Sequence, residues 1–280
     1  MPLIRYPGSK AKLIDPILAA FPCEMTLAMF QTLTDWEYRE PFFGSGAIGF
    51  HLLPRLSRHC SVWLNDADPD LVCLWQSVYA RPMDLIGHIT RFTPSAAAFF
   101  DFKKRDCDGE GSVAERGFRK LALHRMSMSG FGYMSGGPIG GKDQANKLYN
   151  VQCRWNPERM KRDIAMLHRQ LNKFVNVRIT CGDFADLLTD ACCNAFVYLD
   201  PPYYEKGSQL YRFSFDADDH ARLAEALQAT NAQWALSYDD HPEIRRLYSW
   251  ATFKELEVRY SNAVTNKATR PKNREVLITP

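Results

Sequence analysis

The stretch AFVYLDPPYYEKG, residues 195–207, predicts a buried strand that ends in a rigid polar corner. Its five apolar or aromatic residues, Ala195–Leu199, are typical of a strand covered on both faces, as in a parallel sheet. Pro201 and Pro202 lack a backbone N–H and have a fixed φ, so the strand must end before them. Asp200 therefore lies at the carboxyl end of the strand, where open α/β sheets bind their ligands.

Other segments have the pattern of strands that end at polar residues: WEYREPF (36–42), SVWLND (61–66), VNVRITC (175–181) and AQWALSYDD (232–240). Helical patterns lie between them. Pro157 stands in the first turn of the helix predicted within 156–174, and Asp218 or Asp219 is the N-cap expected for the helix within 218–230. This alternation predicts a mostly parallel sheet with helices on both faces.

The middle of the chain, from about residue 69 to 157, has short helical patterns and no clear strand pattern. It includes SGFGYMSGGPIGGK (129–142), with six glycines in fourteen residues, which we expect to become ordered only against a partner. Residues 101–180 hold 16 Lys/Arg and 8 Asp/Glu, a net charge of +8, whereas the rest of the chain has a net charge of −5. A basic segment in an otherwise acidic protein favours a surface that binds a polyanion.

Composition narrows the class of protein further. With 46% hydrophobic and 24% charged residues over 280 positions, the chain resembles an ordinary soluble protein. It has neither a signal-peptide pattern nor an apolar run of the ~18 residues that a membrane span needs, so we expect a cytoplasmic protein without a membrane partner. None of the eight cysteines forms a C-x-x-C pair, so we expect no metal, and most cysteines should be buried.

The segment GSGAIG, residues 44–49, fits the G-x-G-x-x-G pattern of loops that bind nucleotide cofactors. It follows a predicted strand, and Asp66 stands 20 residues beyond Gly46, at the end of the next one. Such glycines let the backbone approach the cofactor, and the acid accepts hydrogen bonds from ribose hydroxyls. NAD and S-adenosylmethionine both contain an adenosine ribose, so this motif does not choose between them.

Taken in order, five motifs resemble those of the Dam-type (D12 class, α-group) N6-adenine-specific DNA methyltransferases. They are RYPGSKAKL (5–13), EPFFGSGAIGF (40–50), NDADPDL (65–71), GDF (182–184) and DPPY (200–203). The resemblance implies an α/β fold: a Rossmann-like, S-adenosylmethionine-dependent methyltransferase sheet with an inserted, mostly helical target-recognition domain. The implied catalytic domain comprises residues 1–68 and 163–280, and the implied recognition domain comprises residues 69–162.

The same resemblance implies a role for individual residues. Its cofactor is S-adenosylmethionine, which Tyr6 and Lys10 would contact. Asp66 would bind the ribose, and Asp183 with Phe184 would bind the adenine ring of the cofactor. The further residues expected to bind the cofactor are Glu40, Phe42, Gly44, Gly46 and Asp200. The expected catalytic residues are Asp200, Pro201, Pro202 and Tyr203, and the residues expected to contact DNA are Arg116, Arg119, Lys120, Arg125 and Lys142.

The chemistry of adenine agrees with this catalytic set. The amino group of adenine is a poor nucleophile because its lone pair is delocalised into the ring. Asp200 can accept one amino hydrogen and the Pro201 carbonyl the other, which localises the lone pair toward the methyl donor. Tyr203 offers a ring on which a flipped base can stack.

The resulting hypothesis is a DNA adenine-N6 methyltransferase that acts as a monomer on double-stranded DNA. Methylation of cytosine N4 or of RNA adenine is the nearest alternative, although an aspartate at position 200 favours adenine. An NAD-dependent dehydrogenase would explain the glycine loop but neither DPPY nor the basic segment. A catalytically inactive DNA-binding module is disfavoured by the intact DPPY motif.

Overall fold

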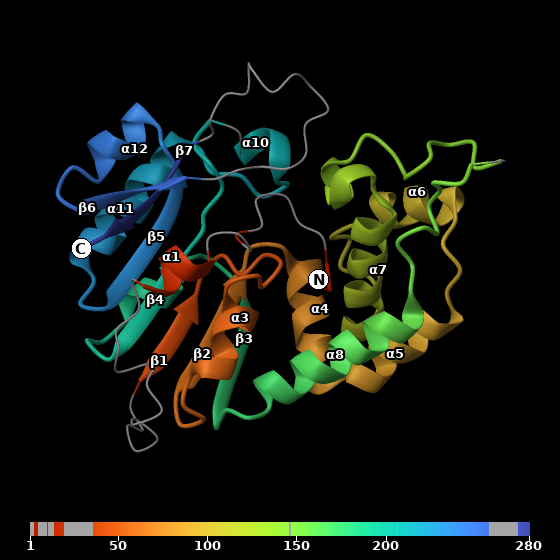
Figure 1. Ribbon diagram of the computed structural model, residues 1–280, viewed down its shortest axis with the longest axis horizontal. Coiled ribbons are helices and arrows are strands. Elements are labelled where there is room, and N and C mark those ends of the chain that lie inside the picture. Colours follow the sequence, from red (N-terminus) through yellow and green to blue (C-terminus); the bar gives the residue numbers. More distant parts are fainter. Residues whose placement is uncertain are drawn as a thin grey trace.

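A computed structural model describes residues 3–4, 10, 14–19, 36–145, 147–205, 207–257 and 274–280. Its centre is a seven-stranded sheet with the order β3-β2-β1-β4-β5-β7-β6 (Figure 1). The strands are β1 (Glu37–Glu40), β2 (Ser61–Asp66), β3 (Asn176–Cys181), β4 (Ala195–Leu199), β5 (Gln233–Asp239), β6 (Thr252–Glu257) and β7 (Arg274–Thr279). The α/β sheet predicted from the sequence is confirmed.

Strands β1 to β5 run parallel, and β7 is antiparallel to both of its neighbours, β5 and β6. All five residues of β4 are buried, as the apolar run Ala195–Leu199 predicts. From β1 the sheet extends to one side through β2 and β3 and to the other side through β4 and β5. The strand order therefore reverses at β1. In open α/β sheets the crevice at such a reversal, at the carboxyl ends of the strands, is where ligands bind.

Helices lie against the sheet and extend beyond it at one side, where α4 to α8 form a helical part (Figure 1). Within the described residues the α-helices are α1 (Ile14–Leu18), α3 (Gly49–Leu52), α4 (Pro69–Ala80), α5 (Pro82–Arg91), α6 (Ala96–Lys104), α7 (Val113–Met126), α8 (Pro157–Leu171), α9 (Asp186–Thr189), α10 (Gly207–Leu210), α11 (Ala217–Ala229) and α12 (Pro242–Leu247). The short 3-10 helices in the described part of the chain are η2 (Leu53–Arg55), η3 (Met128–Gly130) and η4 (Gly132–Met134).

Helix α4 joins the sheet to the helical part. Asp68 caps its first turn by accepting hydrogen bonds from the N–H groups of Asp70 and Leu71. The helix packs against β2 and β3 and also against α7 and α8. The expected domain boundary after residue 162 falls inside α8, which is one continuous helix and also packs on α4 and α5.

Two local expectations were wrong: the N-cap of α11 and the burial of most cysteines. Helix α11 is capped by Asp216, whose side chain accepts from the N–H of Asp219 in a reciprocal capping box, and not by Asp218 or Asp219. The glycine-rich segment 129–142 forms 3-10 turns that pack on α7, and Ile139 in it is fully buried. Most of the described cysteines are exposed rather than buried: Cys153, Cys181, Cys192 and Cys193.

Among the described residues, no helix is both long enough and apolar enough to cross a membrane.

The contact between α4 and α7 predicts the effect of a small substitution. A Cβ atom on Gly117 of α7 would lie 2.6 Å from the Cα atom of Leu74 in α4. Gly117→Ala should therefore lower the free energy of unfolding by about 1–3 kcal/mol, although alanine favours helix. In the matched control Gly87→Ala, the nearest atoms belong to the movable Arg91 guanidinium at 3.3 Å. That variant should gain about 0.5–1 kcal/mol. Denaturant titrations in which both variants changed stability equally would contradict this packing.

Candidate active site

A cavity of about 280 Å³ opens at the carboxyl ends of β1, β2 and β4. Its wall includes these residues predicted from the sequence: Lys10, Glu40, Phe42, Gly44, Asp66, Asp183, Phe184, Asp200 and Pro202. Tyr6, the other expected cofactor contact, lies outside the described residues. Residues far apart in the sequence thus meet at the carboxyl ends of the parallel strands, where the strand order reverses.

Asp200 follows β4 and lies beside this cavity. One carboxylate oxygen, Oδ1, is 2.9 Å from Nζ of Lys10 and accepts a hydrogen bond of 3.1 Å from the hydroxyl of Ser237. Burial raises the pKa of Asp200, and the neighbouring Lys10 ammonium opposes that rise. The carboxylate is therefore held in place by a cation and a hydroxyl, and its side chain stays partly exposed to the cavity.

Lys10 is almost completely buried and has two carboxylates around it. Besides Asp200, Glu275 of β7 lies with Oε2 at 3.7 Å from Nζ, and the ammonium also donates to the hydroxyl of Tyr203. Burial opposes the charged form, but the two carboxylates outweigh it and raise the pKa of Lys10. The ammonium lies over the ring of Tyr203, at 4.5 Å from its centroid. Sequence reasoning placed Lys10 at the cofactor and missed Glu275.

Glu40, at the end of β1, is buried next to the glycine loop. Its Oε2 accepts a hydrogen bond of 2.6 Å from the hydroxyl of Tyr38, and burial raises its pKa well above the usual range. A Cβ atom on Gly49 would lie 2.5 Å from this oxygen, so the third glycine of the motif permits close approach to the carboxylate. Gly46 has a φ of 67° and packs against aromatic rings, a conformation that favours glycine.

Asp66, at the end of β2, ties the two neighbouring strand ends together. Its Oδ2 accepts from the N–H of Gly44 at 2.8 Å, and its Oδ1 accepts from the N–H of Asp68 at 2.9 Å. Burial, and then the charge of Asp68, raise the pKa of Asp66 to about 6, while the two N–H groups oppose the rise. Each carboxylate oxygen can accept more than one hydrogen bond, so Asp66 can still accept from a ligand.

One end of the cavity is aromatic. The ring centroids of Phe42 and Phe184 lie 5.7 Å apart, and that of Phe215 lies 5.5 and 5.3 Å from them. The guanidinium of Arg222 lies 4.4 Å from the Phe184 ring and bonds both oxygens of Asp183 at 2.8 and 2.9 Å. Neither Phe215 nor Arg222 was predicted. Both follow the DPPY motif closely in sequence, and only the fold brings them to GDF.

The corner after Asp200 is fixed by the neighbouring strand. Asp239, the last residue of β5, accepts from the N–H of Tyr204 at 3.1 Å. The Tyr204 ring stacks on the imidazole of His241 with centroids 4.5 Å apart, and His241 caps α12. Tyr204 is therefore a packing residue here, whereas the hydroxyl of Tyr203 reaches Glu275 at 2.7 Å.

The basic residues predicted to contact DNA mostly face the protein interior. Lys120 is 2% exposed and pairs with Asp68 and Asp106. The other pairs and contacts are Arg116 with Asp70 at 2.7 Å, Arg119 with Asp108 at 3.1 Å and Arg125 with the carbonyl of Leu3 at 2.9 Å. The expectation that Lys120 reaches a phosphate was wrong, because its charge is already used to neutralise buried carboxylates. Lys142 alone of the predicted set is exposed.

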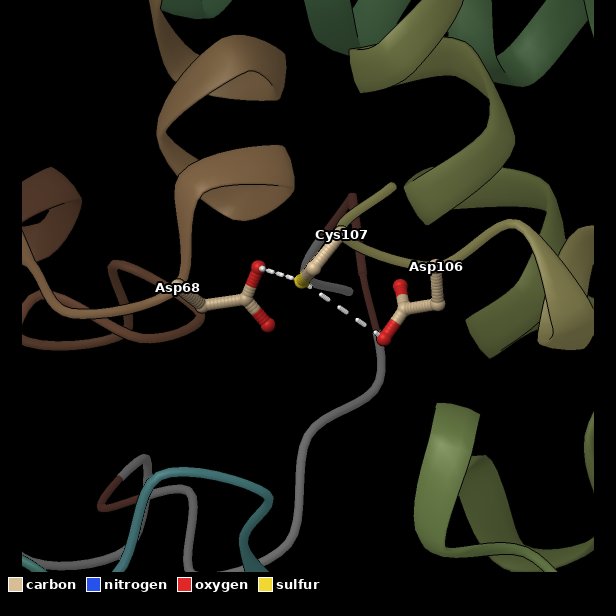
Figure 2. Close-up of side chains that lie close together, drawn as sticks. All are labelled: Asp68, Asp106 and Cys107. Atoms are coloured by element: carbon tan, nitrogen blue, oxygen red, sulfur yellow. Dashed lines mark hydrogen bonds between the residues drawn. The ribbon is translucent and has the colours of Figure 1, made fainter. Parts of the chain in front are cut away.

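Asp68, Asp106 and Cys107 lie close enough together to suggest a metal site (Figure 2). The Cys107 Sγ atom is 3.5 Å from Asp68 and 3.8 Å from Asp106. Lys120 pairs with both carboxylates, and Nη1 of Arg212 is 2.8 Å from Asp106. Burial and the two aspartates raise the pKa of the Cys107 thiol, which disfavours the thiolate that metals bind. We read the cluster as an ion-pair network.

Comparison with known proteins agrees with this geometry. The chain is 24% identical to the type II methyltransferase M1.LlaDCHI of Lactococcus lactis subsp. cremoris, over 99% of this chain and 94% of that protein. It is 26% identical to the type II methyltransferase M.MjaIII of Methanocaldococcus jannaschii, over 80% of this chain and 78% of that protein.

Residues 6–262 match the model of one family over nearly the whole chain, including every strand from β1 to β6. The cavity at the reversal of strand order and the Asp-Pro-Pro-Tyr corner beside it both lie within this match. The chain belongs to the D12 class N6 adenine-specific DNA methyltransferases and is an enzyme that methylates adenine in DNA.

Proposed function

We propose that the protein transfers a methyl group from S-adenosylmethionine to adenine N6 of double-stranded DNA at Asp200, Pro201, Pro202 and Tyr203. The observation that carries the proposal is the position of Asp200. Its carboxylate lies at the end of β4, beside a cavity whose wall combines a glycine loop, an acidic strand end and aromatic rings. A substitution of Asp200 alone therefore tests the proposal.

The chemistry of the cavity fits S-adenosylmethionine. Asp66 would accept hydrogen bonds from the ribose hydroxyls, and the rings of Phe42, Phe184 and Phe215 would enclose the cofactor's adenine. Carboxylates near the opposite end suit a cation, because the cofactor carries a methyl group on a positively charged sulfur. Lys10 would approach the methionine carboxylate, as the family resemblance implies.

In the proposed mechanism, residues of this chain hold the target amino group in the orientation that methyl transfer needs. Asp200 accepts one hydrogen of the amino group and the Pro201 carbonyl accepts the other, so the nitrogen lone pair points into the cavity. The ring of Tyr203 would support the base after it leaves the duplex, a step that costs a few kcal/mol. Ser237 and Lys10 hold the Asp200 carboxylate in position before the reaction, so it does not have to reorient during methyl transfer.

We further propose that the segment between α7 and α8 contacts DNA. Phe131 and Tyr133 of this segment line a small cavity together with Arg212, so it lies next to the main site. Lys142 and Lys147 are exposed, and they are followed by the exposed side chains of Leu148 and Tyr149. Cations with nearby apolar and aromatic groups suit a phosphate backbone and unstacked bases. In Figure 1, α8 lies below α7, along the lower edge of the helical part.

Removing the Asp200 carboxylate tests the catalytic proposal. Asp200→Ala should lower the rate constant of methyl transfer about 10²–10³-fold, because a preorganised acceptor is lost. Radiolabelled S-adenosylmethionine and unmethylated genomic DNA serve for the assay. Mass spectrometry of the digested nucleosides identifies N6-methyladenine or N4-methylcytosine. The control Glu243→Ala removes a carboxylate from the surface of α12 and should keep the wild-type rate. Activity of Asp200→Ala within about tenfold of wild type would refute the assignment.

The raised pKa of Asp66, about 6, predicts a pH dependence of cofactor binding. Ribose hydroxyls donate best to the ionised carboxylate, so affinity should be constant well above pH 6 and fall as the pH drops through it. The fall approaches about tenfold per pH unit. Calorimetry with S-adenosylmethionine between pH 5 and 8 measures it. Asp66→Asn should bind more weakly and without this dependence.

Asp183→Asn is the matched control for that titration. The hydrogen bonds from Arg222 lower the pKa of Asp183, so this carboxylate stays ionised throughout the interval. The variant should keep the wild-type pH profile. A profile that is the same in Asp66→Asn as in wild type would remove Asp66 from the cofactor site.

Salt-dependent binding tests the DNA surface. Each cation that neutralises a duplex phosphate contributes roughly 0.9 to the slope of log affinity against log salt. Replacing Lys142 and Lys147 with Ala should flatten that slope, measured by fluorescence anisotropy on duplex DNA. The control replaces Arg159 and Lys161 of α8, whose charges are paired with Asp163 and Glu158, and should leave the slope unchanged. Equal slopes for both variants would place the DNA surface elsewhere.

A further inference from the structure

Glu275 reaches the active site because its strand runs against the others. Strand β7 is antiparallel to β5, with Glu275 opposite Asp239 in register. The first residues of β7 therefore lie at the edge where the parallel strands end. Glu275 is 1% exposed, and the next three residues of the strand, Val276–Ile278, are buried and apolar.

A carboxylate in such surroundings carries a large desolvation cost unless a cation or strong donors compensate it. Two groups of the Asp-Pro-Pro-Tyr site do so. The hydroxyl of Tyr203 donates to Oε1 of Glu275 at 2.7 Å, and Nζ of Lys10 lies 3.7 Å from Oε2. The same ammonium is 2.9 Å from Asp200. Lys10 is thus shared by two carboxylates that come from different strands.

We propose that Glu275 is a positioning residue for methyl transfer: it draws the Lys10 ammonium partly away from Asp200 and adds a negative charge beside the reacting atoms. The inference rests on the proposed role of Asp200. With Glu275 present, the Lys10 ammonium interacts with both carboxylates. Without the charge of Glu275, Lys10 interacts more strongly with Asp200 and competes with the target amino group for that carboxylate.

The charge of Glu275 matters because methyl transfer moves a positive charge toward this cluster. The N6 lone pair forms the new bond to the methyl carbon while the carbon–sulfur electron pair returns to sulfur. The positive charge passes to N6 until one of its protons leaves for solvent. A further buried negative charge stabilises the nitrogen as it becomes positive, and its removal lowers that stabilisation.

Two substitutions of Glu275 separate its charge from its hydrogen bond. Glu275→Gln keeps the length of the side chain and an oxygen that can accept from the Tyr203 hydroxyl, but it removes the charge. Glu275→Asp keeps the charge on a shorter side chain, which lengthens that hydrogen bond. If charge is what Glu275 supplies, Asp should be faster than Gln. If it acts only as a structural acceptor, Gln should be at least as fast as Asp.

Single-turnover methyl transfer at saturating S-adenosylmethionine and DNA is the measurement, because its rate constant does not depend on the fraction of folded enzyme. We expect Glu275→Gln to lower the rate constant about tenfold or more, with dissociation constants for cofactor and DNA within about twofold of wild type. Glu275→Asp should recover part of the loss. Glu255→Gln makes the same change on the adjacent strand β6, at an exposed carboxylate, and should match wild type.

A Glu275→Gln rate within twofold of wild type, or a Gln rate equal to or above the Asp rate, would overturn the proposal. So would a loss that appears only as weaker cofactor or DNA binding. These outcomes are distinct from a failure of the proposed function, which active Asp200→Ala would signal. If Asp200→Ala is inactive and Glu275→Gln is fully active, the role proposed for Glu275 is refuted and the proposed function stands.

Discussion

Crowding of carboxylates at one edge of the sheet is the constraint on which the rest of this site depends. Parallel strands end at the same edge, and here four of them end in or lead into acids: Glu40, Asp66, Asp200 and Asp239. Like charges that are close together and poorly solvated raise each other's pKa values and destabilise the fold. Burial is the largest cause that raises the pKa of Asp200, Asp66 and Glu40, and a neighbouring carboxylate raises each of them further.

Each acid has its own compensation, and the compensations explain much of the local structure. Glu40 has the Tyr38 hydroxyl, and Asp66 has backbone N–H groups supplied by the glycine loop and the start of α4. Asp200 has Lys10, which is drawn from near the amino terminus of the chain. The glycine at position 49 is needed because any side chain there would collide with the Glu40 carboxylate. Glycine loop and acidic strand ends are therefore one structural unit.

What the sequence could predict was what depends on neighbouring residues along the chain. The strand at 195–199, the polar groups at the strand ends and the helix beginning at Pro157 follow from local patterns. The cap of α11 was misplaced because DADD offers three aspartates, although the spacing of Asp216 and Asp219 is that of a capping box. Glu275 was missed because a single acid in an apolar strand gives no sign of which strand it will pair with.

The charge pattern misled for a related reason. An excess of Lys and Arg along residues 101–180 does not say where those side chains point. Lys120 points to Asp68 and Asp106, where it stabilises the junction between the helical part and the end of β2. The net charge of a segment predicts a charged surface only after the side chains that form ion pairs within the protein have been left out of the sum.

The same junction gives the cavity a wall that is anchored on the helical part. Arg212, in the segment after α10, lines the cavity and bonds both the backbone carbonyl and the carboxylate of Asp106 at 2.8 Å. Its guanidinium also lies 4.3 Å from the ring of Tyr133. Asp106 in turn shares Lys120 with Asp68, two residues beyond Asp66. The chain of ion pairs thus runs from one wall of the cavity, through the helices, to the strand end that forms another wall. Because buried pairs of this kind are costly to break, the helical part and the cavity keep a fixed relation in this structure.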